Sequence, residues 1–370
     1  MIGPVLRRDR SPGARGFLAG LVGPLLAACL VTLVALVVFG DSTMTEIVLL
    51  FGINAIMTVG FQVFVGNTGL VSFGHVAFMA IGAYAAGILS IPSSDKELFY
   101  REMPDFLVRM EVGAVPSLLI AGTAAALVAL VAGAALMRMS GAAASIATLG
   151  LLIITVNVLS QASTITNGPR ALFGIPDRTT FWLTFACLGA SVLASAAFKW
   201  SPWGLRARAS RDDVIAADTV GVPPLRARLP AFVLSAFITG VGGGLYAQLL
   251  TAFTPSSFSV MLVVVIVTMA ILGGIQSITG AVAGATLVTV INELLRRVEA
   301  GVTVFGTEIR GAAGMSAAIL GILLILMLRW RPEGLFAAAE LQLERRDDPE
   351  STGPPQSIDG ATRETPVATQ

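Results

Sequence analysis

The sequence carries little charge. Only 13% of its 370 residues are Asp, Glu, Lys or Arg, whereas soluble domains carry about 25%. Lysine occurs only at Lys96 and Lys199, so nearly all of the positive charge is arginine. The formal net charge of +1 provides no general attraction to a highly charged partner. This composition excludes a soluble enzyme, a disordered scaffold and a nucleic-acid-binding protein.

Histidine and cysteine are also scarce. His75 is the single histidine, and Cys29 and Cys187 lie far apart in apolar stretches, without the spacing of a metal site or a disulfide framework. The sequence contains no G-x-x-x-x-G-K-[ST] phosphate-binding loop. Because the apolar stretches also lack acidic pairs, these residues assemble no catalytic constellation. We therefore predict no catalytic residue, no metal and no cofactor.

Apolar residues make up 55% of the sequence, and the mean hydropathy is +0.82. A membrane-spanning helix needs about 20 mostly apolar residues. The stretches without Asp, Glu, Lys or Arg are 16–40, 47–94, 112–137, 139–169, 179–198, 229–292 and 311–328. In lipid, the backbone polar groups of such stretches must pair within a helix. Stretch 47–94 is long enough for two helices, stretch 229–292 for two or three, and each other stretch for one. This predicts an all-α polytopic membrane protein of about ten transmembrane helices, with nine as the alternative.

Basic residues orient the chain, since cytoplasmic loops carry an excess of Arg and Lys. Segments 1–15 and 199–228 are both rich in arginine and are predicted to be cytoplasmic. The loops 92–111 and 161–178 then face outward, and residues 166–176 of the second loop are rich in turn residues.

The two ends of the chain differ in character. Residues 16–40 are too long an apolar run for a signal peptide and have no small-residue cleavage site, which predicts an uncleaved first span. The membrane domain would then cover residues 16–336. Residues 337–370 are rich in Pro, Ser, Thr and acidic residues and are predicted to form a disordered cytoplasmic tail.

No Asp, Glu, Lys or Arg lies near the middle of a predicted span, and His75 is the candidate there for a group that titrates near neutral pH. Carriers driven by protons or ions usually keep such residues at mid-membrane. A transporter of this composition therefore draws energy from another subunit or conducts passively.

The segment 199–228 contains signals for a short helix. Ser210, followed three residues later by Asp213, fits a capping box, although Asp is shorter than the usual Glu or Gln. Gly221 and the prolines after it end the helix, which predicts about ten helical residues. The helix has a small apolar face made of Val214, Ile215, Ala217 and Val220. It either rests on lipid headgroups or docks into a cytoplasmic ATPase, and the spacing alone leaves both interpretations open.

Several stretches resemble one family of transporters. Residues 212–222, Asp-Asp-Val-Ile-Ala-Ala-Asp-Thr-Val-Gly-Val, resemble the EAA-type loop of ABC importer permeases, and with residues 229–237 they are similar to the LivM branch of branched-chain amino-acid permeases. The family's Gly/Ser/His segment, Gly-rich segment and Arg-Pro-x-Gly-Leu terminus are matched by Gly66–Tyr84, Thr268–Ala285 and Arg329–Phe336. The resemblance covers residues 45–336. Asp218 stands where the family more often has Glu, so a contact of the longer acid could be lost.

The resemblance implies a permease subunit of an ABC importer for branched-chain amino acids, located in the bacterial cytoplasmic (inner) membrane and lacking an ATPase site. The implied partners are a second, LivH-like permease, two cytoplasmic ATP-binding subunits, an extracytoplasmic solute-binding protein, an amino-acid substrate and the lipid bilayer, with no nucleic acid. The implied ATPase-coupling residues are Asp213, Ala216, Ala217, Asp218 and Gly221. The alternatives are a permease of the same architecture for urea or short amides, and an ATP-independent channel or carrier.

Polar residues inside the apolar stretches are candidates for the translocation path or the interface with the second permease. Asn67, Ser72 and His75 lie in a glycine-crowded stretch, residues 60–87, and Asn54 precedes it. Glycines there permit either close helix packing or broken helices beside a cavity. Each polar residue is as readily explained by a hydrogen bond between helices, so both interpretations stay open.

Overall fold

The computed structural model describes residues 42–300, 302–304, 307–309, 314–330 and 334. The predicted cytoplasmic segment 1–15, the first span 16–40 and the tail 337–370 lie outside the described residues. The long helices are α2 (Ser42–Thr68), α3 (His75–Ser90), α6 (Ala114–Leu136), α7 (Ala142–Gln161), α9 (Phe181–Trp200), α12 (Pro224–Leu250), α13 (Val260–Gly273), α14 (Ile278–Ala300) and α15 (Met315–Trp330).

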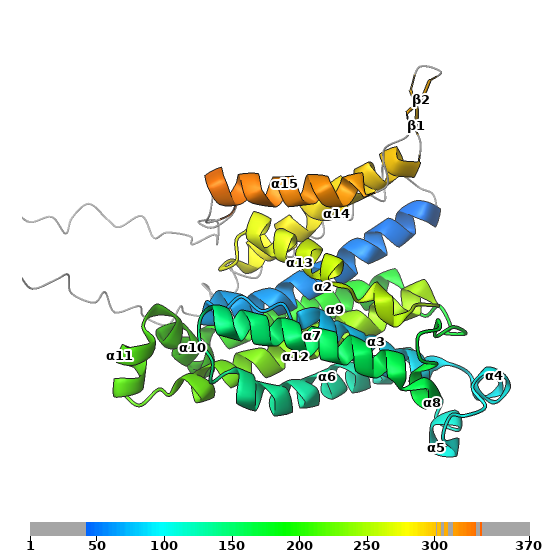
Figure 1. The fold of residues 1–370 in the computed structure, drawn as a ribbon, viewed down its shortest axis with the longest axis horizontal. Coiled ribbons are helices and arrows are strands. Elements are labelled where there is room, and N and C mark those ends of the chain that lie inside the picture. The colour runs from blue at the N-terminus through cyan, green and yellow to red at the C-terminus, as the bar shows by residue number, and fades with distance from the viewer. Residues whose placement is uncertain (1–41, 301, 305–306, 310–313, 331–333, 335–370) are drawn as a thin grey trace, which may run out of the picture.

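Short elements occupy the connections between the long helices. They are α4 (Ser93–Phe99), α5 (Asp105–Val108), α8 (Ser163–Thr166), α10 (Pro202–Asp212), α11 (Val214–Thr219) and the 3-10 helix η1 (Pro255–Ser257). The strands β1 (Val302–Val304) and β2 (Thr307–Ile309) form a small antiparallel hairpin, with Val302 opposite Ile309. Figure 1 shows this hairpin projecting beyond the helices.

The prediction of an all-α polytopic membrane protein is confirmed. Among the described residues, seven helices are long and apolar enough to cross a membrane, or eight if α3 and α4, bent by 104°, are counted as one span. The stretch 229–292 holds three helices, α12 to α14, which is the larger of the two numbers considered for it. The count of ten stays a prediction, because residues 16–40 are not described and α15 has only 16 residues.

Helix α12 lies at the centre of the bundle and packs against α2, α3 and α6. Glycines make this packing close. A Cβ atom added at Gly82 would lie 2.1 Å from the carbonyl oxygen of Gly240, and one at Gly243 would lie 2.0 Å from that of Met79. Lipid tails are as apolar as the helix surfaces, so association depends on such close contact rather than on a hydrophobic driving force.

The short elements gather at opposite ends of the bundle (Figure 1). Helices α10 and α11 lie at one end, and α4, α5 and α8 lie at the other. The segment 199–228 is thus separated from the loops 92–111 and 161–178 by the length of the long helices, as the charge pattern predicts. Which end is cytoplasmic stays a prediction.

Cysteine labelling tests this orientation. In a chain whose two native cysteines are replaced by serine, Ser94→Cys and Thr219→Cys place one thiol at each end, both at exposed positions. We expect a membrane-impermeant maleimide to label position 94 in intact spheroplasts, and to label position 219 only after permeabilisation. The reverse pattern would show that the predicted orientation is inverted.

Candidate functional site

Helix α11 is a six-residue helix whose ends are both closed by the chain's own groups. The carboxylate of Asp213 accepts hydrogen bonds from the backbone N–H groups of Ile215 and Ala216, at 2.9 and 3.0 Å. At the other end Gly221 has a φ of +84°. The N–H of Gly221 donates to the carbonyl of Asp218, and the N–H of Val222 donates to that of Ala217, at 3.0 and 2.9 Å. This pair of bonds is a Schellman motif, which needs the left-handed residue that glycine supplies.

The predicted capping box at Ser210 is wrong. Ser210 lies inside α10, and its buried hydroxyl has no hydrogen-bond partner among the described residues. Helix α10 begins earlier, at Pro202, where Ser201 is the N-cap and its Oγ accepts from the N–H of Gly204 at 3.2 Å. Because α10 runs to Asp212, the next residue caps a separate helix, and α11 is shorter than the predicted ten residues.

The apolar residues of α11 point in two directions. Ile215 and Val220 are 78% and 76% exposed, whereas Ala217 is only 4% exposed and packs inward. Ala216, Asp218 and Gly221 are exposed as well. The single apolar face predicted from the sequence is therefore divided, and the outer surface of α11 offers two large apolar side chains without a full set of contacts in this chain.

Three of the four predicted path residues form hydrogen bonds in the interior of the bundle. Asn67, Ser72 and His75 are buried inside the described bundle. The amide of Asn67 donates to the carbonyl of Val63 in its own helix at 2.8 Å. Ser72 Oγ accepts from the N–H of Gly74 in the turn before α3, at 3.3 Å.

His75 joins three helices. Its Nε2 lies 2.6 Å from Ser235 Oγ, and that hydroxyl donates to the carbonyl of Gly60, also at 2.6 Å. The imidazole is surrounded by four phenylalanine rings, with centroid distances from 5.1 to 6.2 Å. These contacts tie α3 to α12 and α2, which supports the interpretation of His75 as an interhelical hydrogen-bonding residue.

Asn54 also bridges two helices but is only half-buried. Its Nδ2 donates to Thr289 Oγ1 at 3.1 Å, which links α2 to α14. Of the four predicted residues it alone keeps partial exposure within a long apolar helix. A role at the path or at a permease interface stays a prediction for all four.

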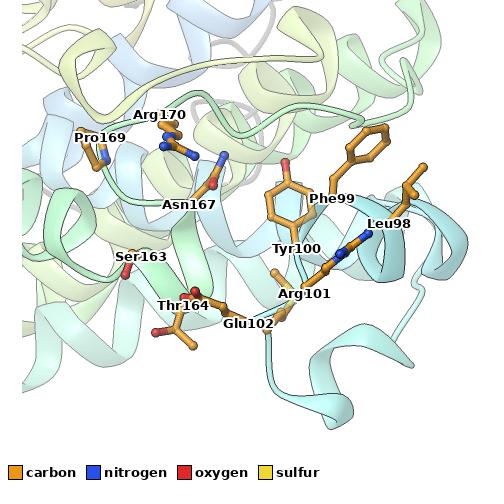
Figure 2. A pocket seen from close by; sticks show the side chains of 11 residues that line it. Leu98, Phe99, Tyr100, Arg101, Glu102, Ser163, Thr164, Asn167, Pro169 and Arg170 are labelled. Atoms are coloured by element: carbon orange, nitrogen blue, oxygen red, sulfur yellow. The ribbon is translucent and has the colours of Figure 1, made fainter.

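A pocket of about 610 Å³ opens at the end of the bundle that carries α4 and α8 (Figure 2). Its wall includes Arg101, Glu102 and Arg170, none of which forms an ion pair with another described residue. Tyr100 holds the wall in place, because its hydroxyl donates to the carbonyl of Phe173 at 2.8 Å and accepts from the N–H of that residue at 2.9 Å. Burial raises the pKa of Tyr100, so the phenol stays protonated as a donor.

Two buried cations were not anticipated from the sequence. Lys96 Nζ donates to the carbonyl of Leu107 in α5 and to that of Met110 just after it. At the other end of the bundle, Arg228 Nη1 donates to the carbonyl of Met139 at 3.2 Å. In the sequence, Lys96 lies just beyond the end of one apolar stretch and Arg228 just before the start of another. That position is the one sequence signal for their burial.

Among the described residues, no group of three His, Cys, Asp or Glu side chains is arranged to hold a metal ion.

Comparison with known proteins gives matches to permeases of branched-chain amino acid transport systems. A family model described as "Branched-chain amino acid transport system / permease component" matches residues 43–328. The high-affinity branched-chain amino acid transport system permease protein LivM of Escherichia coli is 28% identical over an alignment of 356 residues, and the match covers 87% of this chain and 76% of that protein. LivM of Salmonella typhimurium is 27% identical over 337 residues, covering 82% and 71%.

A third relative carries a different name. The guanosine ABC transporter permease protein NupQ of Bacillus subtilis is 26% identical over an alignment of 226 residues, and the match covers 57% of this chain and 69% of that protein. No solved structure matches the chain at a significant level.

Proposed function

This chain belongs to the family of branched-chain amino acid transport system permease components, and from that membership we propose that it is one of the two permeases of an ABC importer for branched-chain amino acids. It is a multi-pass protein of the inner membrane. In this proposal it provides the membrane passage, and separate cytoplasmic subunits bind and hydrolyse ATP. The two LivM relatives, which match most of the chain, support the substrate class.

Helix α11 is the observation that carries the proposal. A permease without a nucleotide site of its own must receive energy through contact with the ATP-binding subunit. Helix α11 suits that contact, because it is closed at both ends and presents Ile215 and Val220 outward. Burying one such side chain against a partner contributes about 1.5–3 kcal/mol.

The coupling residues then have distinct roles. Asp213 caps the helix, and Gly221 closes it. Ala216 and Asp218 lie on the exposed surface that would meet the ATP-binding subunit, whereas Ala217 supports the helix from inside. We infer that Asn54 lies at the passage or at the second permease, and that Asn67, Ser72 and His75 hold the helices behind it.

The partners complete the proposed importer. A LivH-like second permease would pair with this chain in the membrane, and two ATP-binding subunits would meet α11 and its counterpart. An extracytoplasmic solute-binding protein would dock at the end that carries α4 and α8, where the loop 161–178 forms part of the exposed surface.

Reconstitution tests the proposal. The chain is co-expressed with a candidate second permease and candidate ATP-binding subunits from the same organism, placed in proteoliposomes and supplied with a candidate binding protein. We expect uptake of leucine, isoleucine and valine that requires ATP hydrolysis and stops with a non-hydrolysable ATP analogue. We also expect the purified chain alone to hydrolyse no ATP.

Other outcomes separate the alternatives. Preferential uptake of guanosine, urea or short amides would retain the importer but overturn the substrate class. Uptake by the chain without ATP-binding subunits would identify a channel or an ATP-independent carrier.

A further inference from the structure

Arg211, in the last turn of α10, is bonded to the end of a membrane-spanning helix. Its Nη1 donates to the carbonyl oxygen of Gly66 at 2.8 Å. Gly66 lies in the last turn of α2, where carbonyl groups have no donor within the helix and carry partial negative charge. A guanidinium there forms a charge-assisted hydrogen bond, which is stronger than one between neutral groups.

The stem of Arg211 fits a space left open by glycine. Gly69, just after α2, has a φ of +69°, and a Cβ atom added there would lie 2.6 Å from Arg211 Cγ. The side chain of Arg211 is only 24% exposed, and its Nε lies 3.0 Å from the carboxylate of Asp212. The backbone at Gly69 thus lies against the stem of Arg211, and the carboxylate of Asp212 lies against its guanidinium. These two contacts orient the guanidinium toward the carbonyl of Gly66.

Arg211 stands between α11 and the membrane helices. A single extended residue, Asp213, separates α10 from α11, so a displacement of α11 pulls directly on the last turn of α10. The end of α2 in turn lies against the turn between α13 and α14, because a Cβ atom at Gly66 would lie 2.6 Å from the carbonyl oxygen of Ile275. Lys199, at the end of α9, donates to the carbonyl of Gln276 in the same turn, at 3.2 Å.

We propose that Arg211 is a positioning residue that transmits movement of α11 to α2 and to the turn between α13 and α14. The proposal rests on the function of α11 proposed above and adds the route by which its displacement reaches the membrane. A bonded, half-buried arginine suits this task, since the guanidinium fork is planar and loses little freedom on bonding. Helix α10 also packs on α2, α9 and α12, so loss of the arginine leaves the helix in place but removes its hydrogen bond to the carbonyl of Gly66.

The test uses the complete importer in proteoliposomes and measures solute uptake, ATP hydrolysis and co-purification of the ATP-binding subunits. In Arg211→Ala we expect the subunits to co-purify normally and ATP hydrolysis to continue, while the solute transported per ATP falls about tenfold or more. We call the solute transported per ATP hydrolysed the transport ratio. Arg211→Lys should restore part of the transport ratio, since a lysine ammonium supplies the positive charge without the planar guanidinium fork. Arg206→Ala is the matched control, because Arg206 lies on the same helix and its guanidinium lies over the Trp203 ring rather than at α2.

Gly69→Ala approaches the same contact from the other side. Its added Cβ displaces the stem of Arg211, so it should lower the transport ratio as Arg211→Ala does, and the double variant should be no worse than the single ones. A normal transport ratio in Arg211→Ala would overturn the inference. Loss of the ATP-binding subunits from Arg211→Ala would also overturn it, by assigning the residue to docking. If the unmodified importer neither assembles nor transports, the proposed function itself fails.

Discussion

Replacing Ala216 by tryptophan is expected to abolish solute uptake and to lower co-purification of the ATP-binding subunits about tenfold or more. Ala216 is exposed on α11, beside Ile215 and within the segment proposed to enter the ATP-binding subunit. A tryptophan there leaves the capped helix intact, because its side chain points away from the bundle. Its bulk would hold the partner at a distance and remove the contact that Ile215 and Val220 provide.

The measurement is uptake together with subunit retention in the reconstituted importer. Ala252→Trp is the matched control for subunit retention alone, since Ala252 is exposed beyond the far end of α12, away from the contact proposed for the ATP-binding subunit. Ala217→Trp would be less informative, because Ala217 is buried and its replacement disturbs the packing of α11 itself. If α11 merely rests on lipid headgroups, tryptophan is well accommodated there. Normal uptake and normal subunit retention in Ala216→Trp would support that interpretation.

Replacing Gly243 by alanine is expected to prevent stable folding of the chain. The added Cβ would lie 2.0 Å from the carbonyl oxygen of Met79, a backbone atom that cannot turn aside. Helices α12 and α3 would have to separate, which disrupts the close packing at the centre of the bundle. Overpacking typically costs about 1–3 kcal/mol, and more where the backbone must move. That cost is a large fraction of the 5–15 kcal/mol that is typical of a folded protein.

Size-exclusion profiles and thermal unfolding in detergent measure this effect. Gly150→Ala and Gly189→Ala are matched controls, because a Cβ added at either helical position would have no described atom within 4 Å apart from the backbone of its own helix and its chain neighbours. These variants should be as stable as the original chain or slightly more stable, since alanine favours helix by up to about 1 kcal/mol. A Gly243→Ala chain as stable as the two controls would show that α12 and α3 are not held at the described distance.

Features that depend on neighbouring residues were predictable from the sequence. The apolar stretches predicted most of the long helices, because a backbone in lipid must satisfy its hydrogen bonds within each helix. Gly221 was predicted to end α11 and does so, with Pro223 and Pro224 beyond it, since a left-handed residue and a following proline act within a few residues of the helix end. The separation of the basic segment 199–228 from the two other loops likewise followed from the order of charges along the chain.

The start of α11 was decided by tertiary packing. Both Ser210 and Asp213 are acceptable N-cap residues, so local preference does not choose between them. Gly204, Ala207 and Ser210 are all buried and lie three residues apart, which places them on the face of α10 that meets the bundle. Packing of this face keeps Ser210 inside a helix and leaves Asp213 to begin the next one.

The hydrogen-bond partners of single polar residues could likewise not be predicted from the sequence. His75 lies 160 positions before Ser235, and Arg211 lies 145 positions after Gly66. Nothing in the local pattern of either residue identifies a partner so distant along the chain, because many polar groups of similar chemistry lie in between. The sequence by itself determined the membrane class, the approximate spans and the presence of a capped helix in a basic loop. Only the tertiary structure decided which polar groups meet, because those contacts depend on how closely the glycine-lined helices approach one another.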